Sequence, residues 1–213
     1  MQARLIVAVL VIVGAVFGAV HIALSLYSAV DKNWVQFTVP SDLHDEKLME
    51  TQNRRRGLLV ECVDDKDYCH YLEGLADQDT YPNSREILRL RSTAPALAYS
   101  SIILAALAYT LGGIAFAIFR NKPRRRQVLL LFFGVFAWIA AALMFCCIIV
   151  FLELRNQEAH KFDQSLPTIR SSWSRALRKR TVEQMSTAFK VAVASAAIGH
   201  IGSFSMMAAS VWA

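Results

Sequence analysis

Four long runs without a charged residue constrain this chain more than any other feature of its sequence. Each run exceeds the roughly 20 apolar residues that a helix needs to cross a hydrocarbon core about 30 Å thick. The sequence therefore predicts four membrane-spanning helices, at about 5–30, 94–119, 127–152 and 188–212. The charge-free runs behind them are Leu5–Val30, Ser92–Phe119, Gln127–Leu152 and Val191–Ala213.

The composition agrees with a membrane protein. Hydrophobic residues make up 55% of the chain and charged residues 19%, whereas soluble domains average about 45–50% apolar and roughly 25% charged. This excludes a soluble cytosolic enzyme, and it excludes a disordered chain, which needs low hydrophobicity. The rival interpretation of the first run is a cleaved signal peptide. Because the run is longer than the about 7–15 apolar residues of such a segment, we expect four retained spans.

Basic residues without acidic neighbours gather on one side of the predicted topology. They are Arg4, before the first span, and Arg120, Lys122, Arg124, Arg125 and Arg126 in the short link 120–126. The positive-inside rule places both termini and this link in the cytoplasm, and the loops 31–93 and 153–187 outside. We therefore expect the basic link to contact anionic lipid headgroups, at about 1 kcal/mol for each cation, and we expect no nucleic-acid partner.

The first outer loop contains three strand signals. From Trp34 to Val39 apolar and polar residues alternate, and Pro40 closes the segment, which is typical of a strand. Residues 57–63 and 68–72 predict two further strands, whereas 41–56 is polar and predicts a loop. Trp34 itself lies where an indole favours the membrane interface.

Cys62 and Cys69 fall in this outer loop, where the compartment is oxidising. A bridge between them would stabilise the fold by about 2.5 kcal/mol on the chain-entropy model. We therefore predict a Cys62–Cys69 disulfide, which would staple two strands of a sheet that has little core of its own. Cys146 and Cys147 lie within the third span, where we expect packing residues, and the four cysteines do not form a zinc site.

Catalysis has no candidate in this sequence, and we expect no cofactor and no metal. The predicted spans contain no acidic residue, so ion-coupled transport has no obvious carrier. We expect His21 and His200 to face the bundle and to hydrogen-bond to a neighbouring helix. Four residues of the first outer loop do not have the spacing of a known metal site, so we expect them to form a solvated acidic turn. They are Asp64, Asp65, Asp67 and His70.

Between the end of the first predicted span and the start of the second, the sequence contains a set of residues whose order matches a known pattern. They are Trp34, Gly57-Leu58-Leu59, Cys62, Cys69, and then Arg89 or Arg91. This order resembles the first-loop signature of the claudin superfamily, which reads Trp, Gly-Leu-Trp, two residues, Cys, a gap and Cys, with a basic residue often found before span two. That superfamily includes claudins, the peripheral myelin and epithelial membrane proteins, and the auxiliary subunits of calcium channels and glutamate receptors.

Three features depart from the family pattern. Leu59 stands where the signature has its second Trp, and Cys62 and Cys69 are closer together than in typical claudins. The final residues 210–213 do not form the Ser/Thr-x-hydrophobic end that claudins commonly offer to scaffold domains. The branch of the superfamily therefore stays open.

The resemblance implies one claudin-like membrane domain over residues 1–213, built as a left-handed bundle of four transmembrane helices with a small extracellular antiparallel sheet. It implies a plasma-membrane protein of cell–cell junctions or adhesion that shapes paracellular permeability. Its partners would be other copies of itself or related four-span proteins. The contacts would involve Leu58, Leu59, Val60 and residues 166–173.

The resemblance leaves a second function open, that of a gamma-type auxiliary subunit. Such a subunit packs on the pore subunit of an ion channel or on a ligand-gated receptor, and it modulates gating or trafficking. The small residues that would serve this packing are Ala105, Ala106, Gly112 and Gly113.

Overall fold

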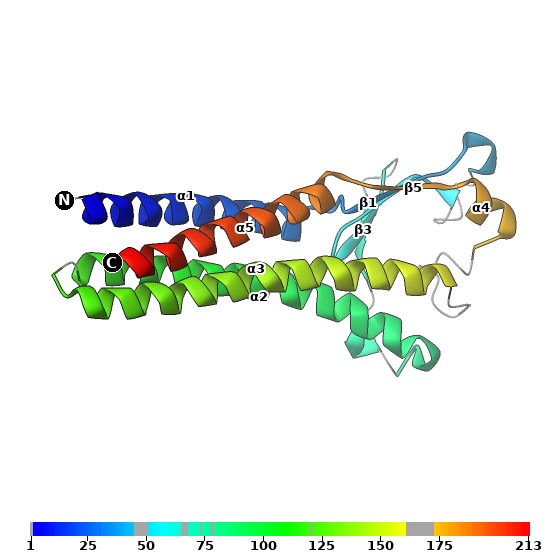
Figure 1. Cartoon of the computed structure of the whole chain (residues 1–213). Coiled ribbons are helices and arrows are strands. Elements are labelled where there is room, and N and C mark those ends of the chain that lie inside the picture. Colours follow the sequence, from blue (N-terminus) through cyan, green and yellow to red (C-terminus); the bar gives the residue numbers. More distant parts are fainter. Residues whose placement is uncertain are drawn as a thin grey trace. The chain divides into compact units, whose positions relative to one another are not determined.

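The computed structural model describes residues 2–44, 51–64, 68–72, 74–77, 79–119, 121–160 and 173–213. Its long helices are α1 (Gln2–Val30), α2 (Arg85–Ile118), α3 (Pro123–His160) and α5 (Thr187–Trp212), with a short α4 (Arg175–Arg180) before the last strand. Its strands are β1 (Val35–Thr38), β2 (Arg54–Arg56), β3 (Val60–Val63), β4 (Tyr68–Tyr71) and β5 (Val182–Met185) (Figure 1). Single turns of 3-10 helix cover Ser41–Leu43, Leu75–Asp77 and Pro82–Ser84.

Among the described residues, four helices are long and apolar enough to cross a membrane, which confirms the prediction of four such segments. Two of them extend beyond the predicted spans. Helix α2 begins at Arg85 and α3 continues to His160, where the sequence predicted loop. The reason is that an apolar run ends at its first charge, whereas a helix continues through good helix formers such as Glu, Leu, Arg and Gln.

The chain divides into two compact units. The bundle unit contains Met1–Tyr27, Leu97–Cys146 and Val191–Ala213, and the sheet unit contains Ser28–Ala96 and Cys147–Lys190. The division falls inside each of the four long helices. The expectation of one membrane domain over residues 1–213 stays a prediction.

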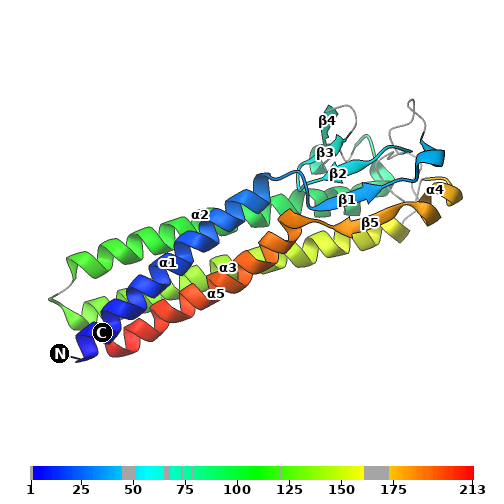
Figure 2. The ribbon, with the colours of Figure 1, turned by 90° about the horizontal axis from the view of Figure 1, so that it is seen from above.

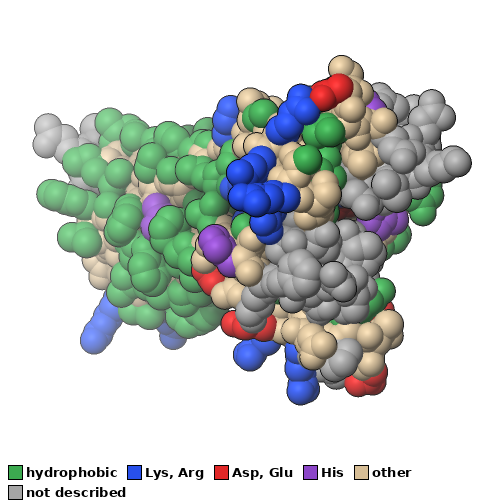
Figure 3. Space-filling view, turned by 90° about the vertical axis from the view of Figure 1, so that its right-hand side faces the viewer, with side chains coloured by type: hydrophobic (Ala, Val, Ile, Leu, Met, Phe, Trp, Pro, Cys, Tyr) green, Lys and Arg blue, Asp and Glu red, His purple; other side chains and the backbone are tan. Residues whose placement is uncertain are grey.

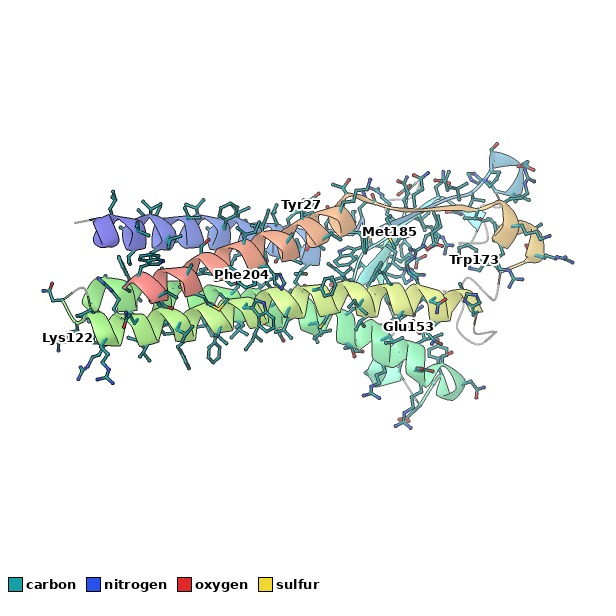
Figure 4. All side chains as sticks on the ribbon, viewed as in Figure 1. Tyr27, Lys122, Glu153, Trp173, Met185 and Phe204 are labelled. Carbon is teal, nitrogen blue, oxygen red and sulfur yellow. A yellow bond between two sulfur atoms is a disulfide. The ribbon has the colours of Figure 1, made fainter. Side chains whose placement is uncertain are left out.

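The bundle unit consists of parts of α1, α2, α3 and α5 that run alongside one another (Figures 1 and 2). Both chain ends and the α2–α3 turn lie at the same end of this unit. A core cluster near this end contains Val7, Leu130, Met206, Ala209 and Ala213. The outward faces carry large apolar side chains that are exposed, as a lipid environment requires. Examples are Leu5, Ile12, Val16, Ile103, Ile114, Val128 and Phe204 (labelled in Figure 4).

A buried polar cluster joins α1 to α5 within the bundle unit. The Nδ1 atom of His21 lies 2.9 Å from the backbone oxygen of Ser195. Because a carbonyl oxygen can only accept, Nδ1 must carry the proton. The hydroxyl of Ser195 donates to the backbone oxygen of His21 at 2.9 Å and lies 2.7 Å from the hydroxyl of Ser25. The prediction that His21 hydrogen-bonds to a neighbouring helix is confirmed.

His200 does not follow the same prediction. Its Nδ1 atom hydrogen-bonds to the backbone oxygen of Ala196, one turn earlier on its own helix, at 2.7 Å. Its contact with a neighbouring helix is an edge contact with the ring of Trp138, at 6.2 Å between centroids. The expected hydrogen bond of His200 to another helix was therefore wrong, because the carbonyl at i−4 satisfies the ring locally.

Glycines set the close approach of helices in the bundle unit. A Cβ atom added at Gly199 would lie 2.8 Å from Nδ1 of His21 and 2.9 Å from Cβ of Ala141. At Gly113, by contrast, an added Cβ atom would meet nothing within 4 Å. Gly199 therefore has a packing requirement that Gly113 lacks.

The sheet unit is built on an antiparallel sheet with the strand order β4-β3-β2-β1-β5 (Figure 2). The pairing of β1 with β5 sets Val35 opposite Met185 and Thr38 opposite Val182. Strands β1, β3 and β4 lie within the predicted strands 34–39, 57–63 and 68–72. Strand β5 was not predicted, and Arg54–Arg56 forms β2 where the sequence predicted loop.

We predict that Gly199→Ala destabilises the protein by about 1–3 kcal/mol, because the new methyl group overpacks the contact with His21 and Ala141. Thermal unfolding in a mild detergent measures the effect. The matched control is Gly113→Ala, which should be neutral or slightly stabilising because alanine favours helix and the position is open. Equal effects of the two substitutions would contradict the packing role of Gly199.

Candidate functional site

The residues of the loop signature all belong to the sheet unit, and Trp34 packs inside it. The indole of Trp34 is fully buried, and its Nε1 donates to the backbone oxygen of Ser28 at 2.6 Å. Its ring makes edge contacts with Phe151 and Phe189, at 4.8 and 5.9 Å between centroids. Through these contacts Trp34 connects the start of β1 with parts of α1, α3 and α5. The indole packs inside the unit and does not face lipid, contrary to the expectation of an interfacial Trp.

Gly57 and Leu58 complete this packing. The backbone N–H of Gly57 donates to the oxygen of Val60 at 2.8 Å, which closes the turn before β3. An added Cβ atom at Gly57 would lie 2.7 Å from the backbone oxygen of Asp31, so only glycine fits. Leu58 is buried, whereas Leu59, which replaces the second Trp of the signature, is 38% exposed.

The predicted disulfide is present in the structure. Cys62 of β3 and Cys69 of β4 are directly opposite each other in the sheet and are joined by a disulfide bond. The bond fixes β4 at one edge of the sheet that the described strands form. Of the other cysteines, Cys147 is buried and Cys146 is exposed.

A buried cluster of arginines and glutamates connects the sheet to helices within the sheet unit. Glu61 of β3 pairs with Arg54 and Arg56 of β2, at 2.8 and 2.6 Å. Arg56 also pairs with Glu158 of α3 at 2.5 Å, and Glu158 pairs with Arg91 of α2 at 2.7 Å. We call these five residues the charge cluster, and all are buried. They link β2, β3, α2 and α3.

Aromatic rings cover one end of the charge cluster. The guanidinium group of Arg54 lies over the rings of Phe37 and Trp173, at 5.3 and 4.5 Å from the ring centroids. The rings of Phe37 and Trp173 are themselves in edge contact (Figure 4 labels Trp173). Trp173 is buried, so it is not available for the contact with another copy that the sequence suggested. Cation–π contacts of this desolvated kind contribute about 2 kcal/mol.

Opposite charges keep the buried groups ionised. Burial alone would raise the pKa of Glu61, but the charges of Arg56 and Arg54 outweigh burial and lower that pKa below its ordinary value. For Arg56, burial would lower the pKa, but the carboxylates of Glu158 and Glu61 raise it. Breaking one such buried pair costs about 3–5 kcal/mol, because an uncompensated charge is left behind.

Sequence reasoning found one member of the charge cluster and missed four. It offered Arg89 or Arg91 as the basic residue of the signature; the structure buries Arg91 in the cluster and leaves Arg89 exposed. Three of the missed residues fall in segments that the sequence predicted as loop: Arg54, Arg56 and Glu158. Glu61 falls in the predicted strand 57–63, but its buried ion pairs were not predicted.

Of the predicted solvated acidic turn, the structure describes Asp64 and His70. Asp64 pairs with Arg55, so its charge is locally compensated. Asp65 and Asp67 lie outside the described residues. On the edge strand β4, Tyr68 is 58% and Tyr71 is 80% exposed. Strand β4 therefore exposes two aromatic side chains.

The basic link lies at the α2–α3 turn of the bundle unit (Figure 4 labels Lys122). Lys122, Arg124 and Arg125 are exposed, whereas Arg126 donates to the backbone oxygen of Ala213 at 2.6 Å. Arg120 lies outside the described residues. Arg124 and Arg125, with Val128 and Leu129, line a shallow cavity of about 550 Å³. Cationic and apolar groups thus share one recess.

Within the described residues no group of three or more His, Cys, Asp or Glu side chains could hold a metal ion. No family model matches the chain, and no curated protein matches it.

We predict that acid destabilises the sheet unit through Glu61. Because the pKa of Glu61 in the folded state lies below its ordinary value of about 4.3, its contribution is full above that value. The contribution is lost as the pH falls through the lowered folded-state pKa. Thermal unfolding of the solubilised protein between about pH 7 and about pH 3 measures the loss.

Glu61→Gln identifies the group responsible. At neutral pH this variant should lose about 3–5 kcal/mol, and its difference from the wild type should shrink in acid. The matched control is Glu153→Gln, at an exposed position of α3, which should follow the wild type throughout. A Glu61→Gln variant as stable as the wild type at neutral pH would contradict this account.

Proposed function

We propose that this chain is a claudin-like, multi-pass protein of the plasma membrane that acts at cell–cell contacts. In this proposal it associates with other copies of itself, or with related four-span proteins, through its sheet unit, and so shapes paracellular permeability. The proposal combines the loop signature described above with the geometry of the sheet.

One observation carries the proposal: the pairing of β1 with β5. Strand β1 comes from the predicted outer loop 31–93, and β5 comes from the predicted outer loop 153–187. Because the two strands belong to one sheet, both loops must lie on the same side of any membrane that the helices cross. This is the arrangement that a four-span protein with two outer loops requires.

The positions of charge and of the chain ends support the proposed orientation. Both ends and the α2–α3 turn lie at one end of the bundle unit (Figure 1). The exposed Lys122, Arg124 and Arg125 belong to that end, which favours the cytoplasmic side. The recess at Arg124 and Arg125 would accept an anionic lipid headgroup, with Val128 and Leu129 beside an acyl chain.

The exposed edge strand β4 is the surface that favours association with another protein. Tyr68 and Tyr71 expose large aromatic area, and aromatic residues are enriched where proteins contact one another. An edge strand also presents unpaired backbone groups that a second strand can meet. Of the contact set suggested by the sequence, Leu58 and Trp173 are buried, Val60 is half-buried and Leu59 is exposed, whereas residues 166–172 lie outside the described residues.

The auxiliary-subunit function stays a second candidate because of α2. Ala105 and Gly112 are buried inside the bundle unit, so they are not available to a partner as the sequence suggested. Gly113 is exposed with open space around it, and Ala106 is half-buried. Small residues on an outward helix face permit close approach of another membrane helix.

The experiment is a mixed-cell assay. Two cell populations, each expressing the full chain with a different tag, are cultured together, and the enrichment of both tags at contacts between unlike cells is measured. We predict enrichment for the wild type and its loss for Tyr68→Ser with Tyr71→Ser, since that variant removes the exposed aromatic area of β4. The matched control is Val182→Ser, which changes an exposed apolar residue on β5, at the opposite edge of the sheet.

Two results would contradict the proposal. One is a tyrosine variant that enriches at contacts as strongly as the wild type. The other is affinity purification in mild detergent that recovers a channel or receptor in fixed stoichiometry, which would favour the auxiliary-subunit function.

A further inference from the structure

The recess at the start of α3 is lined by two kinds of side chain. Arg124 and Arg125 lie in the first turn of the helix, and Val128 and Leu129 follow one turn later. Because residues three and four apart share one side of a helix, each arginine lies beside an apolar residue of the next turn. The recess therefore has a cationic part and an apolar part, about 5.4 Å apart along the helix axis.

The third arginine of this first turn has a different role. Arg126 donates to the backbone oxygen of Ala213 at 2.6 Å, and its guanidinium group lies 5.8 Å from the ring centroid of Phe116. Arg126 is half-buried, whereas Arg124 and Arg125 are exposed. Arg126 thus binds the end of α5 to α3, and the other two arginines line the recess.

The charges of Arg124 and Arg125 are unfavourably placed without an anion. Both lie at the positive end of the helix dipole, and the first turn of α3 contains no acidic residue. Within the part of the chain that the structure describes, no acidic side chain pairs with either arginine. A dianion would compensate both cations, and a phosphate monoester carries a charge of about −1.5 to −2 at neutral pH.

Two observations favour a lipid over a soluble phosphate. The recess encloses about 550 Å³, and Val128 within it is 63% exposed. A soluble phosphate would leave this apolar part in water, whereas an acyl chain would cover it. The bundle unit also exposes large apolar side chains, and Figure 3 shows hydrophobic side chains gathered over a broad area with few charged ones. A surface of this kind belongs in lipid.

We propose that this recess is a binding site for one molecule of phosphatidate, the phospholipid whose phosphate monoester is attached directly to its glycerol. The guanidinium groups of Arg124 and Arg125 bind the phosphate through paired hydrogen bonds. Val128 and Leu129 contact an acyl chain. The short distance between the two parts of the recess favours a phosphate without a sugar between it and the glycerol.

The inference rests on the proposed function, because that function places the link 120–126 beside the cytoplasmic headgroups. It goes beyond a general attraction of the link to anionic lipid, because it requires one saturable site that distinguishes a phosphate monoester from other anionic headgroups.

The test counts lipids bound to the full chain by native mass spectrometry from a neutral detergent. Dioctanoyl phosphatidate and dioctanoyl phosphatidylserine are titrated separately, and glycerol 3-phosphate, which lacks acyl chains, is added as a competitor. We predict one saturable site for phosphatidate, with a dissociation constant about tenfold or more below that for phosphatidylserine. Equal binding of the two lipids would overturn the proposal, because binding would then follow charge alone. Displacement of phosphatidate by an equal concentration of glycerol 3-phosphate would overturn it by identifying a site for soluble phosphate.

Variants separate the geometry of the recess from its charge. Arg124→Lys with Arg125→Lys keeps both charges but removes the paired donors, so it should weaken phosphatidate binding by about tenfold. Val128→Ser, at an exposed position, should weaken it by about threefold or more because the acyl contact is lost. The matched control is Lys122→Gln, which removes one exposed cation of the same link from outside the recess lining and should have a smaller effect than either. Undiminished binding by the double lysine variant, or a loss as large in Lys122→Gln, would overturn the proposal.

A labelling arm separates this inference from the proposed function. A membrane-impermeant maleimide should label Asn121→Cys, at an exposed position of the link, in permeabilised cells but no more than the wild type in intact cells. Labelling of Asn121→Cys in intact cells would overturn the proposed orientation, whatever the detergent-solubilised protein binds. Protection in intact cells together with equal binding of phosphatidate and phosphatidylserine would overturn the inference and leave the orientation standing.

Discussion

The paired charges of Glu61 and Glu158 with Arg54, Arg56 and Arg91 are the interaction on which the sheet unit depends. Each ion loses several kcal/mol of hydration on burial, and only close oppositely charged partners offset that loss. Here each glutamate contacts two arginines, and Arg56 contacts both glutamates. A cluster connected in this way requires that β2, β3, α2 and α3 be in place together. The cluster therefore favours one arrangement of these four elements more strongly than apolar packing alone would.

The cluster determines which surfaces are left for function. Phe37 and Trp173 pack against Arg54 of the cluster, and Leu58 is buried, so these side chains do not face a partner. Strand β4 is held at the far edge by the Cys62–Cys69 disulfide and exposes Tyr68 and Tyr71. Helix α4 is anchored by the buried Leu177 and by the ion pair of Arg180 with Asp42. Firmly fixed, separate surfaces of this kind suit a protein that acts by contact.

The sequence predicted those features that depend on local pattern. Long apolar runs revealed the four helices, and alternation from Trp34 to Val39 revealed β1. The pairing of Cys62 with Cys69 was predicted because both fall in the predicted outer loop, where the compartment is oxidising, and the structure contains that disulfide. His21 was assigned to a neighbouring helix correctly, because a polar side chain in an apolar span needs a partner.

The features that the sequence missed depend on distant partners. Arg54–Arg56 has no apolar alternation, and it forms a buried strand because its charges meet Glu61 and Glu158; the latter is 102 positions from Arg56. Strand β5 is short and polar, and it forms because β1 offers a free edge. The partners of β2 and β5 cannot be identified from a local window of sequence. His200 is a different case, because its ring hydrogen-bonds to the backbone oxygen of Ala196, four residues earlier on its own helix.

The most direct test of the central claim is a double-mutant cycle on Arg91 and Glu158. The free energy of unfolding is measured in mixed micelles for the wild type, Arg91→Met, Glu158→Met and the double variant. The charge cluster predicts a coupling energy of about 1.5–3 kcal/mol, so that the double variant loses less than the sum of the single losses. Additive losses, with a coupling energy near zero, would show that the two side chains do not depend on each other and would contradict the account.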